Sequence, residues 1–106
     1  ALSYAQLDPA AQMVFRQLGV IVADFATSLA QLVVVLDTEG QITDVLHRLL
    51  RRNLIMYDVV RERWRLHDLV RDLARQHLEA AGEAEAAQWR YTRAVVQMAQ
   101  EIQDQY

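Results

Sequence analysis

The run from Arg63 to Arg71 contains the side chains of this sequence whose types and spacing point to chemistry. Arg63 to Leu66 alternate between charged and apolar residues, as in a half-buried strand, and a helical pattern begins at Asp68. His67 is therefore expected at a strand–helix junction, beside the first free backbone N–H groups of the helix, where an anion is most easily held. The residues leave two interpretations of His67 open, and the first is a contact with an anion. The alternative is a histidine that only fills a partly buried corner of a small helical core.

Asp68 is predicted to be the N-cap of that helix rather than a catalytic acid, because a carboxylate at this position turns toward backbone N–H groups. No spacing indicates a Ser-His-Asp set or a pair of catalytic carboxylates. Cys and Lys are absent, which excludes disulfides, thiolate metal sites and a lysine-containing phosphate loop. His47 and His77 have no partners at metal-ligand spacing, so no metal site is expected. The chain is therefore expected not to be an enzyme.

The composition is that of an ordinary globular chain, with 53% hydrophobic and 24% charged residues among 106. No long apolar run or secretory signal is present, and the lack of Cys fits a cytoplasmic location, which we expect. The absence of an initiating Met leads us to expect a piece of a larger protein. The net charge of −3 is uneven, because residues 41–78 hold eight Arg against five acidic residues. This mildly basic centre is weaker than that of a free-standing DNA-binding protein.

The first two predicted helices lie in the N-terminal third of the chain. Asp8 and Pro9 are typical of a helix start, and Gly19 is expected to end that helix in a left-handed conformation. The inward face of this helix is predicted to consist of Ala11, Val14, Phe15 and Leu18. A second helix is expected within 20–36, with Ser28 and Gln31 as a capping box. A short strand at 33–35 is the alternative, and residues 37–40 are expected to form a turn.

The middle and C-terminal parts are predicted to form a helix over 42–52, a β-hairpin, and two further helices. Asn53 is expected to stop the first of these helices, and the hairpin strands are expected at 54–57 and 63–66. The predicted inward residues are Ile42, Val45, Leu46, Leu49 and Leu50 of the first helix; Trp64 and Leu66 of the hairpin; Leu69, Val70, Leu73, Ala74 and Leu78 of the next helix; and Ala84, Ala87, Tyr91, Val95, Met98 and Ile102 of the last.

This order predicts a mainly α fold, a winged helix-turn-helix with a two-stranded β-hairpin wing and an additional C-terminal helix. We expect the winged-helix domain to span residues 1–82, with its penultimate helix closing near Gly82. Residues 83–106 are expected to form the C-terminal helix, the start of an arm toward a following domain.

Several short motifs, in order, carry a resemblance over residues 2–82. They are Leu2-Ser3-Tyr4 with Leu7 and Pro9, Phe15-Arg16-Gln17-Leu18-Gly19-Val20, Phe25, Leu49 with Leu54-Ile55, and Trp64-Arg65-Leu66-His67-Asp68-Leu69-Val70-Arg71-Asp72-Leu73-Ala74. Together they resemble the winged-helix domain of the NB-ARC type, from the bacterial members of the signal-transducing STAND ATPases. The run at Leu66-His67-Asp68 is similar to that family's Met-His-Asp signature, with Leu66 in place of Met.

The resemblance implies a non-catalytic regulatory module of a nucleotide-switch ATPase. In such a module His67 would contact the β-phosphate of ADP and stabilise the inactive state, and Asp68 would support the motif. ADP or ATP with Mg would be bound by the parent protein, and no cofactor is expected in this chain alone. The implied partners are the nucleotide-binding and sensor domains of the same polypeptide, with homo-oligomerisation of the parent on activation. No membrane partner is expected.

The alternative function is a DNA-binding winged-helix transcriptional regulator. In this reading Arg48, Arg51, Arg52 and Arg61 would contact DNA phosphates. The predicted helix over 42–52 lacks the variety of Asn, Gln and Ser side chains that reads base edges, and nearby acidic residues dilute its charge. DNA is therefore the less expected partner. A protein-interaction module without any ligand is a third possibility.

Overall fold

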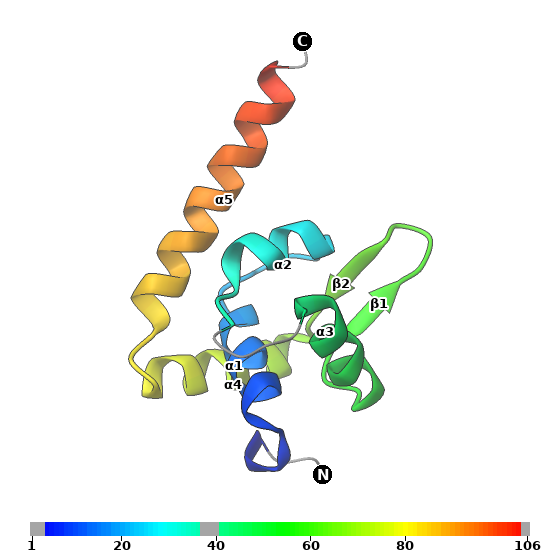
Figure 1. Cartoon of the computed structure of the whole chain (residues 1–106), viewed down its shortest axis with the longest axis vertical. Helices are drawn as coiled ribbons and strands as arrows, with labels where there is room; N and C mark the ends of the chain where they lie inside the picture. The colour runs from blue at the N-terminus through cyan, green and yellow to red at the C-terminus, as the bar shows by residue number, and fades with distance from the viewer. Residues whose placement is uncertain (1–3, 37–40, 105–106) are drawn as a thin grey trace.

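The computed structural model describes residues 4–36 and 41–104, and the turn predicted at 37–40 lies outside them. The elements in chain order are η1 Tyr4–Gln6, α1 Pro9–Leu18, α2 Thr27–Val33, α3 Ile42–Arg51, β1 Met56–Asp58, β2 Arg63–Arg65, α4 Asp68–Ala80 and α5 Ala84–Asp104. The predicted order of helices and hairpin is confirmed. Helices α1 to α4 and the hairpin form a compact body, from which α5 extends as a long arm (Figure 1).

The start of α1 is as predicted, because the Asp8 carboxylate accepts a hydrogen bond from the backbone N–H of Ala11 at 2.9 Å. The expected left-handed end at Gly19 is wrong, since its φ is −61°. Gly19 is required there by close packing instead. A Cβ atom on this residue would lie 2.7 Å from the backbone nitrogen of Arg75 in α4. The missing side chain therefore allows the end of α1 to touch the α4 backbone.

Helix α2 forms, but the predicted capping box does not. Its N-cap is Ala26, without a side-chain hydrogen bond, and Ser28 lies inside the helix. The hydroxyl of Thr27 accepts a hydrogen bond from Trp64 Nε1 at 2.9 Å, so the helix start is held by the hairpin. The helix ends at Val33, and Val34 is already extended. The alternative strand at 33–35 is not formed, and Val35 bonds to the side chain of Gln17 instead.

The hairpin is antiparallel, with Tyr57 opposite Trp64 in its centre. Strand β1 begins at Met56, two residues later than predicted. On its other side Trp64 exchanges two backbone hydrogen bonds with Phe25, at 2.8 and 2.9 Å. Because the backbone of Trp64 bonds to Phe25, its pair with Tyr57 is of the non-hydrogen-bonded kind, in which side chains lie closest. The two rings are 4.4 Å apart between centroids.

The core confirms most of the predicted inward residues. Its fully buried large side chains are Trp64, Phe15, Phe25, Leu18, Ile21, Leu46, Leu49, Ile55, Leu78, Val14, Val20 and Val33. The inward face of α4 is formed by Val70, Ala74 and Leu78. Two predicted inward residues of this helix are wrong, because Leu69 is 75% and Leu73 39% exposed.

The inward face of α5 is also shifted from the prediction. Ala87 and Ala94 are buried and Tyr91 packs partly on the core, where the helix passes α2. Val95 and Ile102 were expected to be inward, but they are 45% and 60% exposed. The helix therefore packs on the body through its first half, and its second half projects beyond α2 (Figure 1).

The close contact at Gly19 leads to a first prediction. Gly19→Ala is expected to destabilise the chain by about 1–3 kcal/mol, since the added methyl group must push the backbone of α1 away from that of α4. Chemical denaturation measures the change in the free energy of unfolding. Ser28→Ala, at an exposed position of α2, is the control and is expected to change it by less than about 0.5 kcal/mol. An unchanged stability of Gly19→Ala would contradict the close packing.

Candidate functional site

His67 lies at the junction of β2 and α4, one residue after Leu66 and three residues after Trp64. Trp64 and Leu66 are 2% and 3% exposed, so the alternation of the strand turns the His67 side chain outward. His67 is the N-cap residue of α4, with φ −60° and ψ 148°, but its ring makes no capping hydrogen bond. Its side chain is exposed, so it does not fill a corner of the core.

The first turn of α4 has no side-chain cap among the described residues. The carbonyl of His67 accepts a hydrogen bond from the N–H of Arg71 at 2.8 Å, as the start of the helix requires. The preceding N–H groups of the first turn are the unpaired donors of a helix N-terminus, where the helix dipole also favours negative charge. An exposed imidazole beside these groups can donate a hydrogen bond to an anion.

The predicted role of Asp68 as N-cap is wrong, because Asp68 is the first residue inside α4. Its carboxylate accepts a hydrogen bond from Arg71 Nη2 at 3.3 Å, in an i, i+3 ion pair. Arg71 also donates to the carbonyl of Val22 at 3.1 Å. A carboxylate in the first turn interacts favourably with the helix dipole, so Asp68 stabilises the start of α4 next to His67.

The exposed face of α4 begins with two leucines close to His67. Leu69 and Leu73 are four residues apart, so they lie on one face of the helix. This exposed apolar pair follows the unpaired His67 along the chain. Sequence reasoning missed it because both leucines were assigned to the core.

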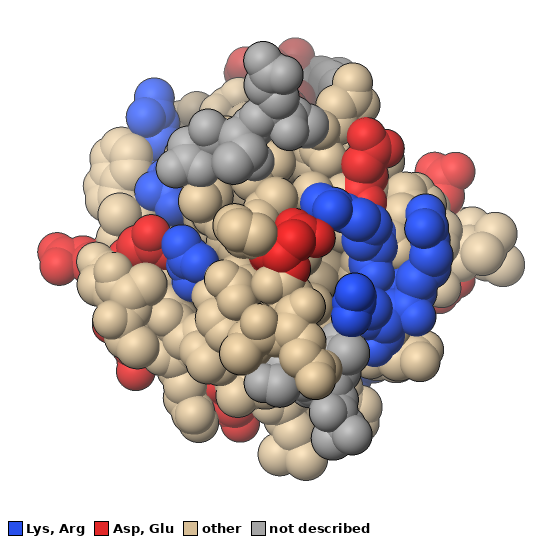
Figure 2. All heavy atoms as spheres, turned by 60° about the horizontal axis from the view of Figure 1, so that its bottom comes forward, with Lys and Arg blue, Asp and Glu red and all other residues tan. Residues whose placement is uncertain are grey.

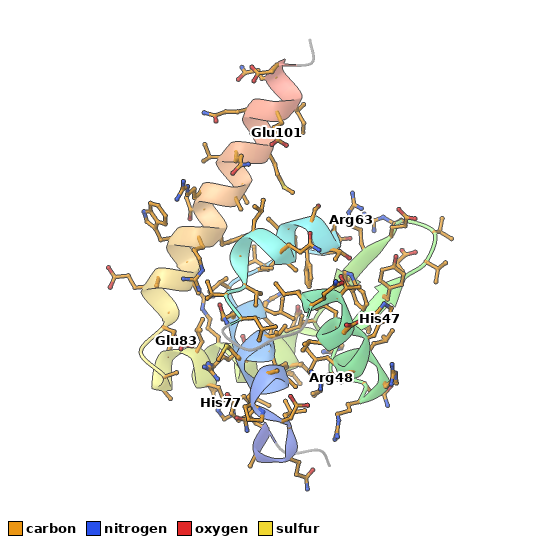
Figure 3. All side chains as sticks on the ribbon, in the orientation of Figure 1. His47, Arg48, Arg63, His77, Glu83 and Glu101 are labelled. Atoms are coloured by element: carbon orange, nitrogen blue, oxygen red, sulfur yellow. The ribbon has the colours of Figure 1, made fainter. Side chains whose placement is uncertain are left out.

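The arginines of the DNA-binding alternative do not form one open basic face. Arg48 is paired with Asp8 at 2.9 Å, and Arg61 is paired with Asp24 at 3.1 Å. Arg51 and Arg52 are exposed and form no ion pair with any residue in 4–36 or 41–104. In Figure 3 Arg48 lies near the lower part of α3, whereas Arg63 lies on the opposite side of His47, on the hairpin.

The other two histidines have structural positions. The ring of His77 stacks on Tyr4 with centroids 3.7 Å apart, and that of His47 meets Trp64 edge-on at 5.4 Å. No group of three potential metal ligands occurs within the described ranges. No helix in this part of the chain is both long and apolar enough to cross a bilayer.

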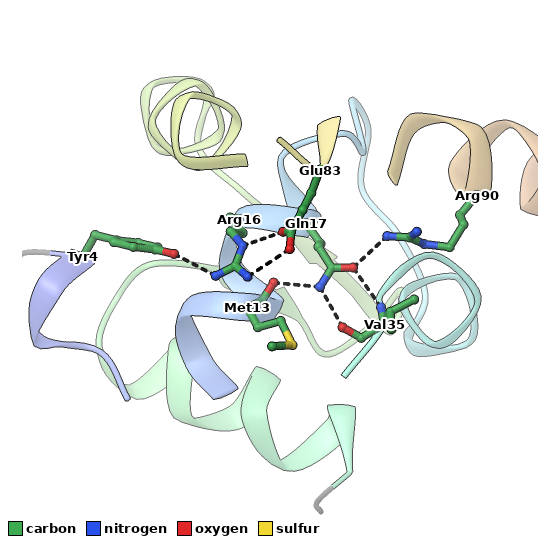
Figure 4. A network of polar contacts seen from close by, with 7 residues as sticks. All are labelled: Tyr4, Met13, Arg16, Gln17, Val35, Glu83 and Arg90. Atoms are coloured by element: carbon green, nitrogen blue, oxygen red, sulfur yellow. Dashed lines mark hydrogen bonds and ion pairs between the residues drawn. The ribbon is translucent and has the colours of Figure 1, made fainter. Parts of the chain in front are cut away.

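A polar network that the sequence did not reveal fastens α5 to the body (Figure 4). Arg16 Nε lies 2.7 Å from Glu83 Oε1, and Arg16 Nη2 lies 3.3 Å from Glu83 Oε2. The Tyr4 hydroxyl accepts a third bond from Arg16, at 3.0 Å. The hydrogen bond from Arg16 holds the pKa of Glu83 below its ordinary value, and the same pair raises the pKa of Arg16.

Gln17 is the buried member of this network, at 3% exposed. Its amide nitrogen donates to the carbonyls of Met13 and Val35, at 3.0 and 2.8 Å. Its oxygen accepts from the N–H of Val35 at 2.8 Å and from Arg90 Nη2 at 2.9 Å. Arg90 also donates to the carbonyl of Val33 at 2.8 Å. The signal in the sequence was a polar residue three positions after Val14, on the apolar face of α1.

Comparison with known proteins adds no family. No family model matches this chain, and neither a curated protein nor a solved structure matches it.

The Arg16–Glu83 pair predicts a pH dependence of stability. Because the pKa of Glu83 is lowered in the folded chain, the pair stabilises it above the ordinary pKa of 4.5, and this contribution is lost as the pH falls through the lowered value. Glu83→Gln is expected to cost about 1 kcal/mol near pH 7, measured by thermal unfolding. The difference from the wild type is expected to shrink in acid.

Glu85→Gln is the matched control, since Glu85 is exposed and has no ion pair in the described part of α5 or the body. It is expected to change the free energy of unfolding by less than about 0.5 kcal/mol. Equal losses for both variants, or a loss for Glu83→Gln that grows in acid, would show that the Arg16–Glu83 pair does not fasten α5.

Proposed function

We propose that this chain is the regulatory winged-helix module of a nucleotide-switch ATPase of the STAND type, and that it performs no chemistry itself. In this function His67 donates a hydrogen bond to the β-phosphate of ADP bound in a neighbouring domain of the same polypeptide. The contact stabilises the compact, inactive arrangement. The single observation that carries the proposal is the exposed, unpaired imidazole of His67 beside the uncapped first turn of α4.

The arrangement of strands and helices supports the winged-helix part of the proposal. The hairpin follows α3 directly, and the Phe25–Trp64 bridge adds a third extended segment between α1 and α2. Small β-sheets of this kind beside a helix-turn-helix are a feature of winged helices. The order of α1, α2, α3, hairpin and α4 is the order that the proposed fold needs.

The energetics fit a switch rather than a binding site. A hydrogen bond from an imidazole to a phosphate contributes roughly 1.5–3 kcal/mol, because one partner is charged. This is sufficient to shift an equilibrium between two states about tenfold or more. It is too little to hold a nucleotide alone, so most of the nucleotide affinity must come from the neighbouring domain.

Leu69 and Leu73 support a neighbouring domain on this side of the molecule. Burying a fully exposed leucine contributes about 1.5–3 kcal/mol, so covering Leu69, at 75% exposed, would gain most of this and covering Leu73, at 39%, less than half. A domain that covers this face of α4 would also lie next to His67.

DNA binding is less well supported. Two of the arginines that it would use, Arg48 and Arg61, are already paired with carboxylates. At the hairpin turn Asp58 and Glu62 accompany Arg61 and Arg63, so the turn carries no excess of positive charge. A salt-dependent gel shift with this chain would favour the DNA-binding alternative.

The decisive test is His67→Ala in the complete parent polypeptide. We expect faster release of ADP, about tenfold, and constitutive activity, because the inactive state loses a contact that the active state does not have. Nucleotide release is measured with labelled ADP. Arg65→Gln, an exposed neighbour on β2, is the control. Wild-type ADP retention in His67→Ala, together with wild-type regulation, would refute the proposal.

Two measurements on the chain itself accompany that test. His67→Ala should change the free energy of unfolding by less than about 0.5 kcal/mol, because the side chain is exposed and unpaired. Calorimetry should detect no micromolar affinity for ADP in the wild-type chain. A large loss of stability would show that His67 has a structural role. Tight ADP binding would show that the whole nucleotide site lies within these residues.

A further inference from the structure

A hollow of about 220 Å³ lies between the beginning of α1 and the end of α3. It is lined by Asp8, Ala11, Arg48, Leu49, Arg51 and Arg52. Figure 2 shows a group of blue arginine side chains gathered on one side of this face of the molecule, with a red carboxylate beside them. The hollow has room for several water molecules, at roughly 30 Å³ each. None of its residues belongs to the junction around His67.

The charges around this hollow do not cancel. Asp8 is the acidic residue that lines it, and both of its oxygens are used: Oδ1 accepts from the Ala11 N–H and Oδ2 from Arg48 Nη1, each at 2.9 Å. Arg48 is thereby neutralised and held in place. Arg51 and Arg52 line the hollow and form no ion pair with any residue of 4–36 or 41–104, so two positive charges face it without a counter-ion from this part of the chain.

Two helix ends of opposite partial charge meet at the hollow, the C-terminus of α3 and the N-terminus of α1. The C-terminal carbonyls of a helix carry partial negative charge, but those of Leu49 and Leu50 already accept hydrogen bonds from residues 52–54. The positive end of the α1 dipole lies on the other wall, at Asp8 and Ala11. Ala11 and Leu49 also line the hollow.

We propose that this hollow is a binding site for a phosphate group, as an inorganic phosphate, a pyrophosphate or a phosphate ester. Guanidinium groups present two parallel N–H donors that match the oxygens of a phosphate. Two free guanidinium groups balance a dianion, and Arg48, held by Asp8, adds a third set of donors at the rim. The site is independent of the phosphate contact proposed for His67, because the two share no residue.

The experiment is a titration of the isotope-labelled 106-residue chain with inorganic pyrophosphate at low ionic strength, followed by NMR. We expect saturable shifts of the Arg51 and Arg52 side-chain N–H signals and of the Ala11 amide. The expected dissociation constant is on the order of 1 mM, because the site is open to solvent. Added salt should weaken binding, as for any exposed ionic contact.

Variants locate the site. The double substitution Arg51→Gln with Arg52→Gln is expected to weaken pyrophosphate binding at least about tenfold, and each single substitution by less. Arg65→Gln removes one exposed charge elsewhere, and His67→Ala tests the junction; both should bind as the wild type does. Because all four positions are exposed, the variants are expected to fold, which their amide spectra will show.

Three outcomes would overturn the proposal. The first is the absence of saturable shifts. The second is binding that is unchanged by the double substitution, or lost in His67→Ala. The third is binding of a short DNA duplex at least about a hundredfold tighter than pyrophosphate, with equal losses at Arg51, Arg52 and Arg63, which would replace a small-anion site with a nucleic-acid surface.

Discussion

Trp64 connects more parts of this protein than any other residue described above. Its backbone pairs with Phe25, its indole N–H donates to Thr27 at the start of α2, and its ring lies against Tyr57 of β1 and His47 of α3. These contacts fix the direction of β2 and, with it, the inward turn of Leu66. The outward position of His67 follows directly. The proposed site is thus a consequence of one buried aromatic side chain three residues earlier.

The sequence predicted the features that depend on local patterns. The alternation around Trp64, the apolar stripe of α3 and the Asp8 cap are all properties of neighbouring residues. The errors concern which of several apolar positions meets a partner. On α4 both Leu69 and Val70 fit a helical stripe, and only the position of α1 decides that Val70 is inward. The predicted left-handed conformation of Gly19 is wrong for the same reason, since the contact of Gly19 with Arg75 depends on packing between distant segments.

At the candidate site the sequence predicted the position of His67 at the joint, but not the neighbours that define its chemistry. Asp68 and His67 are adjacent, and the backbone angles after β2 decide which of them is the N-cap of α4. The pair of Asp8 with Arg48 joins residues that are 40 positions apart, so no local pattern could indicate that one arginine is neutralised. The number of arginines in α3 is therefore larger than the number of its unpaired positive charges.

The attachment of α5 has a mechanical consequence. Glu83 and Arg90, which tie it to the body, lie just before and within its first two turns, whereas the helix runs to Asp104. At 1.5 Å per residue, 21 helical residues measure roughly 30 Å. The ten residues after the buried Ala94 account for roughly 15 Å of this length, so a tilt of about 10° of the packed half would carry the far end through at least roughly 3 Å. Small changes in the contacts that Gln17 and Arg16 make with this segment would therefore be amplified at the far end of the helix.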